Sequence, residues 1–299
     1  MSDFWILLTA ALVACSCSLL GCFLVLRKMA MIGDAISHSV LPGIVIAFLL
    51  SGSRDSIFML LGASVLGLIT VFLIQLFQQS GVQADASIGV VFTALFSVGV
   101  VLVSLYTRQV DLDLDCVLYG EIIRVPWDTI TFAGMDIGPK AVWTLGLVLL
   151  LSSVVIGLFY KQFKICSFDP AMAAAVGIPV ALFHYVLMGL VSVTTVASFE
   201  SVGAILVVGM LVVPAATAYL LTERLGVMIA YSMLVGVISS TAGYYVSVLL
   251  DASIAGCIIC VAGALFVLAL LFSPSHGVVW RKRKQRRGMA ADTASHAAG

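Results

Sequence analysis

Charged residues are scarce in this sequence: Asp, Glu, Lys and Arg make up 10% of the 299 residues, whereas hydrophobic residues make up 62%. A soluble domain carries about 25% charged residues. The mean hydropathy is +1.19, and the apolar runs are long and unbroken instead of alternating over ~10 residues. The composition therefore predicts an all-α, polytopic transmembrane helical bundle and argues against a β-barrel.

Several sequence motifs that would define an enzyme or a voltage sensor are absent. There is no GxxxxGK[ST] loop, so the chain does not hydrolyse ATP by that route. The lack of HExxH and GxSxG weakens the case for a membrane-embedded protease. No regular row of Arg or Lys indicates a voltage sensor. We expect a non-enzymatic chain with no catalytic residues and no permanently bound cofactor.

The seven cysteines do not form the framework of a secreted, disulfide-rich domain. Five of them lie inside apolar runs: Cys15, Cys17, Cys22, Cys257 and Cys260. Cys257 and Cys260 have CxxC spacing, but in an apolar helix such a pair is more often two small packing residues than a zinc or redox site.

The apolar runs predict eight or nine transmembrane helices within one transmembrane domain, residues 1–274. The candidate spans are 4–26, 31–50, 57–77, 87–106, 141–160, 181–199, 203–221, 226–249 and 253–273. In the pair 181–199 and 203–221, only Phe199–Val202 separates the two members, so a broken helix is a further interpretation. Residues 275–299 are expected to form a basic, disordered tail.

The distribution of basic residues predicts the orientation of the chain. With nine spans and the N-terminus outside, the inner segments hold eleven basic residues and the outer segments hold four. The inner set comprises Arg27, Lys28, Lys161, Lys164, Arg224 and the six basic residues of 281–287. We therefore expect the C-terminus to be cytoplasmic. The basic tail is interpreted as a topology anchor that attracts anionic lipid, and not as a nucleic-acid site.

Asp34 and His38 are the most informative residues of the chain. They are four residues apart and therefore share one face of a helix. A carboxylate near the middle of an apolar span costs roughly 2.5–3.5 kcal/mol. Carboxylate oxygen and imidazole nitrogen both bind divalent transition metals, so a metal path is the first hypothesis. Two ligands are too few for a complete site, and a two-fold dimer would supply two more. A purely structural hydrogen bond is the competing interpretation.

Three further residues are candidates for gating or for lining a path. Pro42 cannot donate a backbone hydrogen bond to His38, and Pro214 is expected to bend its helix in the same way. Glu200 lies between two apolar spans and could simply reach the membrane interface. His184, near the end of a span, is interpreted as structural.

A long inner loop, residues 160–179, contains one short helix at about 169–178. Asp169 is predicted to be its N-cap, with Pro170 at the first helical position. Gly177 and Pro179 are predicted to end it. The helix is rich in small residues, such as Ala174, and could dock into a groove of a partner; a plain linker is the alternative.

With these residues in place, the chain resembles the permease subunits of bacterial ABC importers for manganese, zinc and iron, the ABC-3 family. The resemblance covers about residues 4–273. The matching segments, in order, are Arg27–Gly43, Asp85–Thr93, Val117–Ile123, Asp169–Gly177 and Val202–Ala218. Two features depart from the family pattern: the acidic segment Asp111–Asp115, which looks longer than usual, and the basic tail.

The resemblance implies a fold like that of the vitamin B12 importer permeases, in the bacterial inner membrane. It implies that Asp34 and His38 coordinate the transported cation, and that the helix at 169–178, with Asp169, Pro170, Ala174 and Gly177, is the coupling helix. The implied partners are a separate ABC ATPase, an extracytoplasmic metal-binding protein, and a second permease copy or a sister permease.

The leading functional hypothesis is thus the permease of an ATP-driven importer of manganese, zinc or iron. An ion-coupled secondary metal transporter is the alternative, in which the 169–178 helix would be only a linker. A membrane enzyme that uses Asp34 and His38 as acid and base is weaker, since no further catalytic set accompanies them. An Asp/His site without cysteine suits all three metals.

Overall fold

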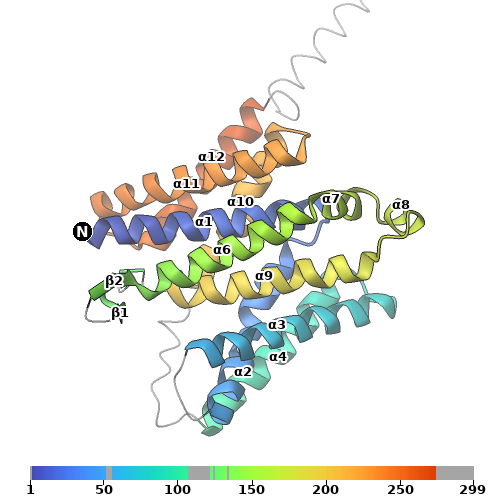
Figure 1. Ribbon diagram of the computed structural model, residues 1–299, viewed down its shortest axis with the longest axis horizontal. Helices are drawn as coiled ribbons and strands as arrows, with labels where there is room; N and C mark the ends of the chain where they lie inside the picture. Colours follow the sequence, from blue (N-terminus) through green and yellow to red (C-terminus); the bar gives the residue numbers. More distant parts are fainter. Residues whose placement is uncertain (1, 52–55, 107–121, 124, 133–134, 274–299) are drawn as a thin grey trace, which may run out of the picture.

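The computed structural model describes residues 2–51, 56–106, 122–123, 125–132 and 135–273 (Figure 1). Within these residues, nine helices are long and apolar enough to cross a membrane. They are α1 (Ser2–Leu26), α2 (Met31–Ser51), α3 (Ser56–Gln79), α4 (Ala84–Tyr106), α6 (Lys140–Leu158), α9 (Val180–Val202), α10 (Ala204–Leu221), α11 (Leu225–Leu250) and α12 (Ile254–Phe272). The predicted all-α transmembrane bundle is confirmed. The predictions for the acidic segment Asp111–Asp115 and for the tail 275–299 lie outside the described residues.

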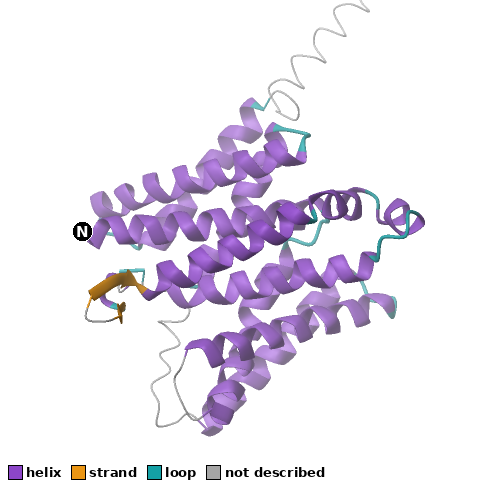
Figure 2. Cartoon of the chain, in the orientation of Figure 1, coloured by secondary structure: helices purple, strands orange, loops and turns teal. Residues whose placement is uncertain are grey.

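Five shorter elements accompany the nine long helices. They are the 3₁₀ turn η1 (Val125–Trp127), the strands β1 (Thr129–Phe132) and β2 (Met135–Pro139), and the helices α7 (Tyr160–Phe168) and α8 (Pro170–Ala175). Figure 2 shows the two strands as a small hairpin at one end of the helical bundle. The hairpin packs on the start of α1, because a Cβ at Gly138 would lie only 2.8 Å from the ring of Trp5.

Helix α7 was not anticipated, because residues 160–168 were expected to form part of a loop. Phe163 and Cys166 are buried, whereas Lys161 and Lys164 are exposed. Apolar residues three positions apart, alternating with lysines, are the signature of a short amphipathic helix. The segment therefore folds as a helix that lies against the bundle.

Helix α1 occupies the centre of the bundle and contacts α6, α9, α10 and α11. Helices α2, α3 and α4 pack on one another and join the rest mainly through α9 and α10. In Figure 1, α1, α6 and α9 run nearly parallel, whereas α2 crosses the view steeply. Because α2 is steeply inclined to these helices, its two ends do not lie level with theirs.

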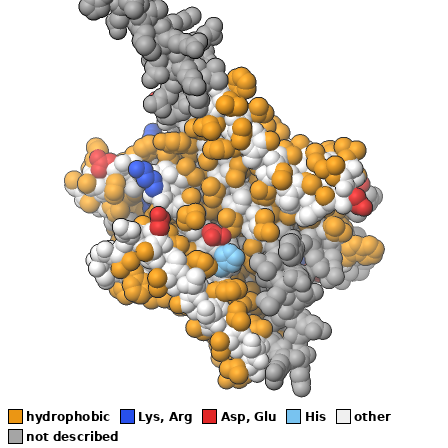
Figure 3. Space-filling view, turned by 180° about the vertical axis from the view of Figure 1, so that it is seen from behind, with side chains coloured by type: hydrophobic (Ala, Val, Ile, Leu, Met, Phe, Trp, Pro, Cys, Tyr) orange, Lys and Arg blue, Asp and Glu red, His pale blue; other side chains and the backbone are white. Residues whose placement is uncertain are grey.

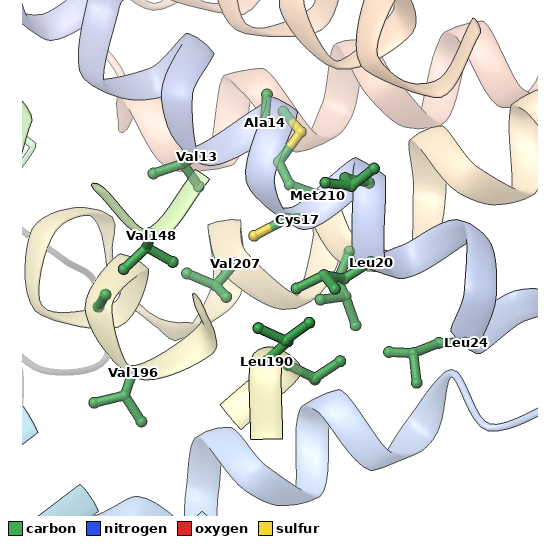
Figure 4. Packing of buried hydrophobic residues seen from close by; sticks show 14 of the residues in the cluster. Val13, Ala14, Cys17, Leu20, Leu24, Val148, Leu190, Val196, Val207 and Met210 are labelled. Atoms are coloured by element: carbon green, nitrogen blue, oxygen red, sulfur yellow. The ribbon is translucent and has the colours of Figure 1, made fainter. Parts of the chain in front are cut away.

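The hydrophobic core lies between α1, α6, α9 and α10 (Figure 4). Leu20 of α1 and Val207 of α10 are fully buried there, together with the thiol of Cys17. The Cys17 Sγ lies 4.0 Å from the Ser198 hydroxyl. Within the described residues, the cysteines of α1 and α12 are free thiols in membrane-spanning helices, and Cys260 is exposed on the surface of α12.

The break between α9 and α10 lies later than the sequence suggested. Residues Phe199–Val202 were expected to separate two spans, but they form the last turn of α9. Gly203 alone separates the helices, with a φ of +82° that favours glycine. Glu200 is therefore a helical residue, exposed at the end of α9.

Candidate functional site

Asp34 and His38 lie on one face of α2 and contact each other. The Oδ1 atom of Asp34 is 3.5 Å from the Nε2 atom of His38. Both side chains are accessible, 37% for Asp34 and 33% for His38. The pair is thus neither buried in the core nor fully outside it, and its oxygen and nitrogen atoms can be reached by an ion.

The pair lies at mid-depth of the bundle, although Asp34 is in the first turn of α2. A Cβ at Gly33 would lie 2.5 Å from the side chain of Leu211, midway along α10. A Cβ at Gly67, in the middle of α3, would lie 3.2 Å from Ile36. The steep course of α2 therefore brings its first two turns level with the centres of its neighbours.

Two aromatic rings of α4 flank the imidazole of His38. The ring centroids of Phe92 and Phe96 lie 5.8 and 6.1 Å from the His38 ring. These contacts restrict the rotation of the imidazole. The surface seen in Figure 3 is mostly hydrophobic, with a histidine beside an acidic side chain near its centre. A polar pair on such a surface is unusual enough to indicate a function.

Within the described part of the chain, no group of three or more His, Cys, Asp or Glu side chains could hold a metal ion. Asp34 and His38 are thus two candidate ligands without a third from the same chain among those residues. A structural zinc site uses four protein ligands, so the pair does not form one. A weak transit site, or a site completed by a second chain, remains compatible with two ligands.

The two proline candidates lie within continuous helices. Helix α2 continues through Pro42, and α10 continues through Pro214. Gly99 of α4 packs on Pro42, because a Cβ there would lie 2.7 Å from the proline ring. Pro42 is thus part of the contact between α2 and α4, and Pro214 is buried in the core.

The predicted caps of the short helix are confirmed. The backbone N–H of Met172 donates a hydrogen bond to the Asp169 carboxylate at 2.9 Å, and Pro170 starts α8. Gly177 has a φ of +86°, and the backbone N–H groups of Gly177 and Ile178 close the C-terminal turn at 3.0 Å each. The short helix and its caps form as expected.

The structure does not gather all the candidate residues into one site. Asp34 and His38 lie at mid-depth, whereas α8, with Asp169 to Gly177, lies beyond the ends of the spans. Glu200 lies at the opposite end of α9 from α8. The candidates therefore form a central polar pair, a helix at one end, and the Glu200 carboxylate at the other.

One contact was not anticipated from the sequence. The Arg27 Nε atom, in the turn between α1 and α2, donates a hydrogen bond to the hydroxyl of Ser167 in α7 at 3.1 Å. The two residues are 140 positions apart, so no local sequence signal could have indicated the contact. The turn that leads into the Asp34 helix is therefore tied to the segment before α8.

The long apolar helices define a multi-pass membrane protein. The family model described as "ABC 3 transport family" matches residues 3–273. The chain belongs to this family.

Several relatives match along most of the chain, and two of them illustrate the similarity. The manganese transport system membrane protein MntD of Bacillus subtilis is 54% identical over 290 residues, 95% of this chain and 98% of MntD. The zinc transport system membrane protein TroD of Treponema pallidum is 43% identical over 277 residues, 92% of this chain and 75% of TroD.

Solved structures support the fold. A chain of PsaBC from Streptococcus pneumoniae, in complex with Fab, superposes with a TM-score of 0.77 and 31% identity, over 94% of each chain. An inward-facing metal-chelate type ABC transporter superposes with a TM-score of 0.58 over 89% of this chain and 85% of its own, and at 19% identity it shows the fold alone. The expected architecture of an ABC importer permease is confirmed.

Proposed function

We propose that this chain is the permease subunit of an ATP-driven importer of manganese or zinc in the bacterial inner membrane. The relatives described above are named as manganese and zinc transport proteins, and they give iron no support. The observation that carries the proposal is the Asp34–His38 pair at mid-depth of a bundle with this fold. In this proposal, residues 1–274 form the permease domain.

Asp34 and His38 line the ion path and bind the metal in transit. An oxygen and a nitrogen ligand suit both manganese and zinc. A single chain would leave both half-exposed side chains facing hydrocarbon, which is costly for a carboxylate. A second copy of the chain, or a sister permease, therefore covers this face and supplies further ligands.

Helix α8 acts as the coupling helix to a separate ABC ATPase. It lies outside the spans, and the apolar side chains of Met172 and of its C-cap residue Val176 are 59% and 66% exposed. Exposed apolar side chains between firm caps suit a docking contact. Asp169, Pro170, Ala174 and Gly177 hold the helix in this form.

The end of the bundle that carries α8 faces the cytoplasm. This end also carries Arg27, Lys28, Lys161, Lys164 and Arg224, as the positive-inside rule requires. The N-terminus is then outside and the C-terminal tail inside. The opposite end, where the β-hairpin and the 85%-exposed Trp127 lie, receives the metal from an extracytoplasmic metal-binding protein.

Pro42, Pro214 and Glu200 act in gating. The two prolines lie in helices that contact the path or the core. Helices that contain a proline lack one backbone hydrogen bond and therefore bend more easily. Glu200 lies at the outer end of α9, next to the Gly203 break.

Dependence on ATP tests the proposed function. Proteoliposomes that hold the permease, its ATPase and the binding protein should take up manganese or zinc only when ATP is supplied to the cytoplasmic face. Permease alone, under an imposed proton gradient, should show only background uptake. Gradient-driven uptake by the permease alone would instead support an ion-coupled secondary transporter, in which α8 has no ATPase to contact.

The α8 cap provides a second prediction. Asp169→Ala removes the carboxylate that accepts the Met172 N–H bond and should destabilise α8 by about 0.5–2 kcal/mol. ATP-driven uptake should fall severalfold, with less ATPase retained when the complex is purified. Asp169→Asn keeps an N-cap acceptor and is the matched control. Equal uptake by the alanine and asparagine variants would contradict the coupling role of α8.

A further inference from the structure

A pocket of about 480 Å³ lies beside the turn between α1 and α2, at the end of the bundle that carries α8. We call it the Arg27 pocket. Its wall combines residues from that turn, α3, α7, α8 and α9, among them Arg27, Lys28, Gln75, Ser167, Pro170 and His184. Its volume is within the usual range for small-ligand sites. Two of these residues are basic and one is a histidine, and no acidic residue is among the described residues that line the pocket.

The guanidinium of Arg27 is only partly satisfied. Its Nε atom donates to Ser167, but its Nη2 atom is buried without a hydrogen-bond partner. Burial lowers the pKa of Arg27, because removal from water disfavours the charged form. A buried donor with a full charge and no partner costs free energy, which a bound anion would offset.

Lys28 occupies a position that normally belongs to glycine. Its φ is +57°, and the N–H groups of Lys28 and Met29 bond back to Val25 and Leu24 at 3.1 and 2.9 Å. This is a helix C-terminal turn whose left-handed residue is usually glycine. A lysine there is strained, because the left-handed conformation brings its Cβ too close to the backbone. A strained position that places a second positive charge at the pocket indicates a function for that charge.

We propose that the Arg27 pocket binds a phosphate group. Arg27 and Lys28 would neutralise its charge, and the guanidinium fork of Arg27 suits the oxygens of a phosphate. The Ser167 hydroxyl and the His184 imidazole can add hydrogen bonds. Two sources share this chemistry: free inorganic phosphate and the head group of an anionic phospholipid.

The position of the pocket is compatible with both sources. It lies where α1 ends and α9 begins, at the level where lipid head groups meet the ends of spans. Apolar residues such as Leu26, Met29 and Val180 also line it and could contact the first carbons of a lipid. A bound phosphate would join the turn leading into α2 to the segments on either side of α8.

Titration of the purified transporter tests the site. The complete complex is prepared in a phosphate-free maltoside detergent, and native mass spectrometry counts the bound ligands. The probes are inorganic phosphate, short-chain phosphatidylglycerol and, as a zwitterionic control, short-chain phosphatidylcholine. Arg27→Gln and the milder Lys28→Gln are compared with Arg224→Gln, an exposed arginine at the same end of the bundle that does not line the pocket.

The wild type and the Arg224→Gln variant should retain one phosphate-bearing ligand, and both pocket variants should weaken its binding by about tenfold or more. Saturation by inorganic phosphate would identify the free ion as the source, and saturation by phosphatidylglycerol alone would identify the lipid. Equal binding by all three variants would overturn the proposal. Absence of any saturable phosphate-binding site in the full complex would overturn the proposal as well.

Discussion

Cells that carry the complete transporter with Asp34→Asn should take up manganese or zinc at least about 10–100-fold more slowly than the wild type. Losing an outer-shell partner of a metal ligand typically costs 10–100-fold in metal affinity, and a direct ligand should cost no less. Asparagine keeps the size of aspartate but loses its negative charge. His38→Gln should have a similar effect, because it removes the imidazole nitrogen.

The asparagine variant separates a metal ligand from a structural hydrogen bond. The Asp34 and His38 side chains are 3.5 Å apart, and an asparagine oxygen could still accept a hydrogen bond from the imidazole. If the pair only stabilised α2, Asp34→Asn would therefore leave uptake nearly unchanged. Loss of uptake with normal amounts of assembled complex would place the metal at this pair.

Radioactive metal uptake at matched membrane expression is the measurement, with Glu223→Gln as control. Glu223 is an exposed carboxylate in the short connection between α10 and α11, away from the pair. Its loss should leave uptake close to that of the wild type. Full uptake by Asp34→Asn and His38→Gln would show that the ion path lies elsewhere, even though the chain belongs to the same family.

Features that depend on local sequence were predictable. The spans follow from apolar length, and the caps of α8 follow from an N-cap aspartate, a first-turn proline and a glycine that adopts a positive φ. Such signals act within a few residues, so one sequence is enough to read them. Asp169 and Gly177 are the clearest cases.

Features that depend on tertiary packing were not predictable from the sequence. That Asp34, in the first turn of α2, lies level with Leu211 in the middle of α10 follows from the course of α2, which its own residues do not encode. The hydrogen bond from Arg27 to Ser167 joins segments 140 positions apart. In α7, by contrast, a local signal was present in the spacing of Phe163 and Cys166, although the segment was expected to belong to a loop.

Helices α2 and α3 pack closely at a pair of glycines. Gly43 of α2 faces Gly62 of α3: a Cβ at Gly62 would lie 2.9 Å from the Gly43 carbonyl oxygen and 2.5 Å from the Cβ of Ala47. Small residues let membrane helices approach closely. The hydroxyl of Thr70 also donates a hydrogen bond to Ser39 across the same interface, at 2.8 Å.

We expect Gly62→Val to destabilise the protein by about 1–3 kcal/mol or more, because the added atoms overlap backbone that cannot move aside. The fraction of purified protein that stays monodisperse after heating is the measurement. Gly146→Val in α6 is the matched control, since no atom lies within 4 Å of a Cβ at Gly146. It adds the same side chain to a membrane helix and should leave the stability nearly unchanged.

Gly62→Val and Gly146→Val should also differ in their effect on metal uptake. Helix α2 carries Asp34 and His38, and α3 is one of the helices against which it packs most extensively. If Gly62→Val pushes α2 away from α3, the pair moves relative to the path, and uptake should fall even below the melting temperature. Gly146→Val should keep normal uptake. A stable, fully active Gly62→Val protein would show that α2 can shift without loss of function, and that the exact position of the pair matters less than its chemistry.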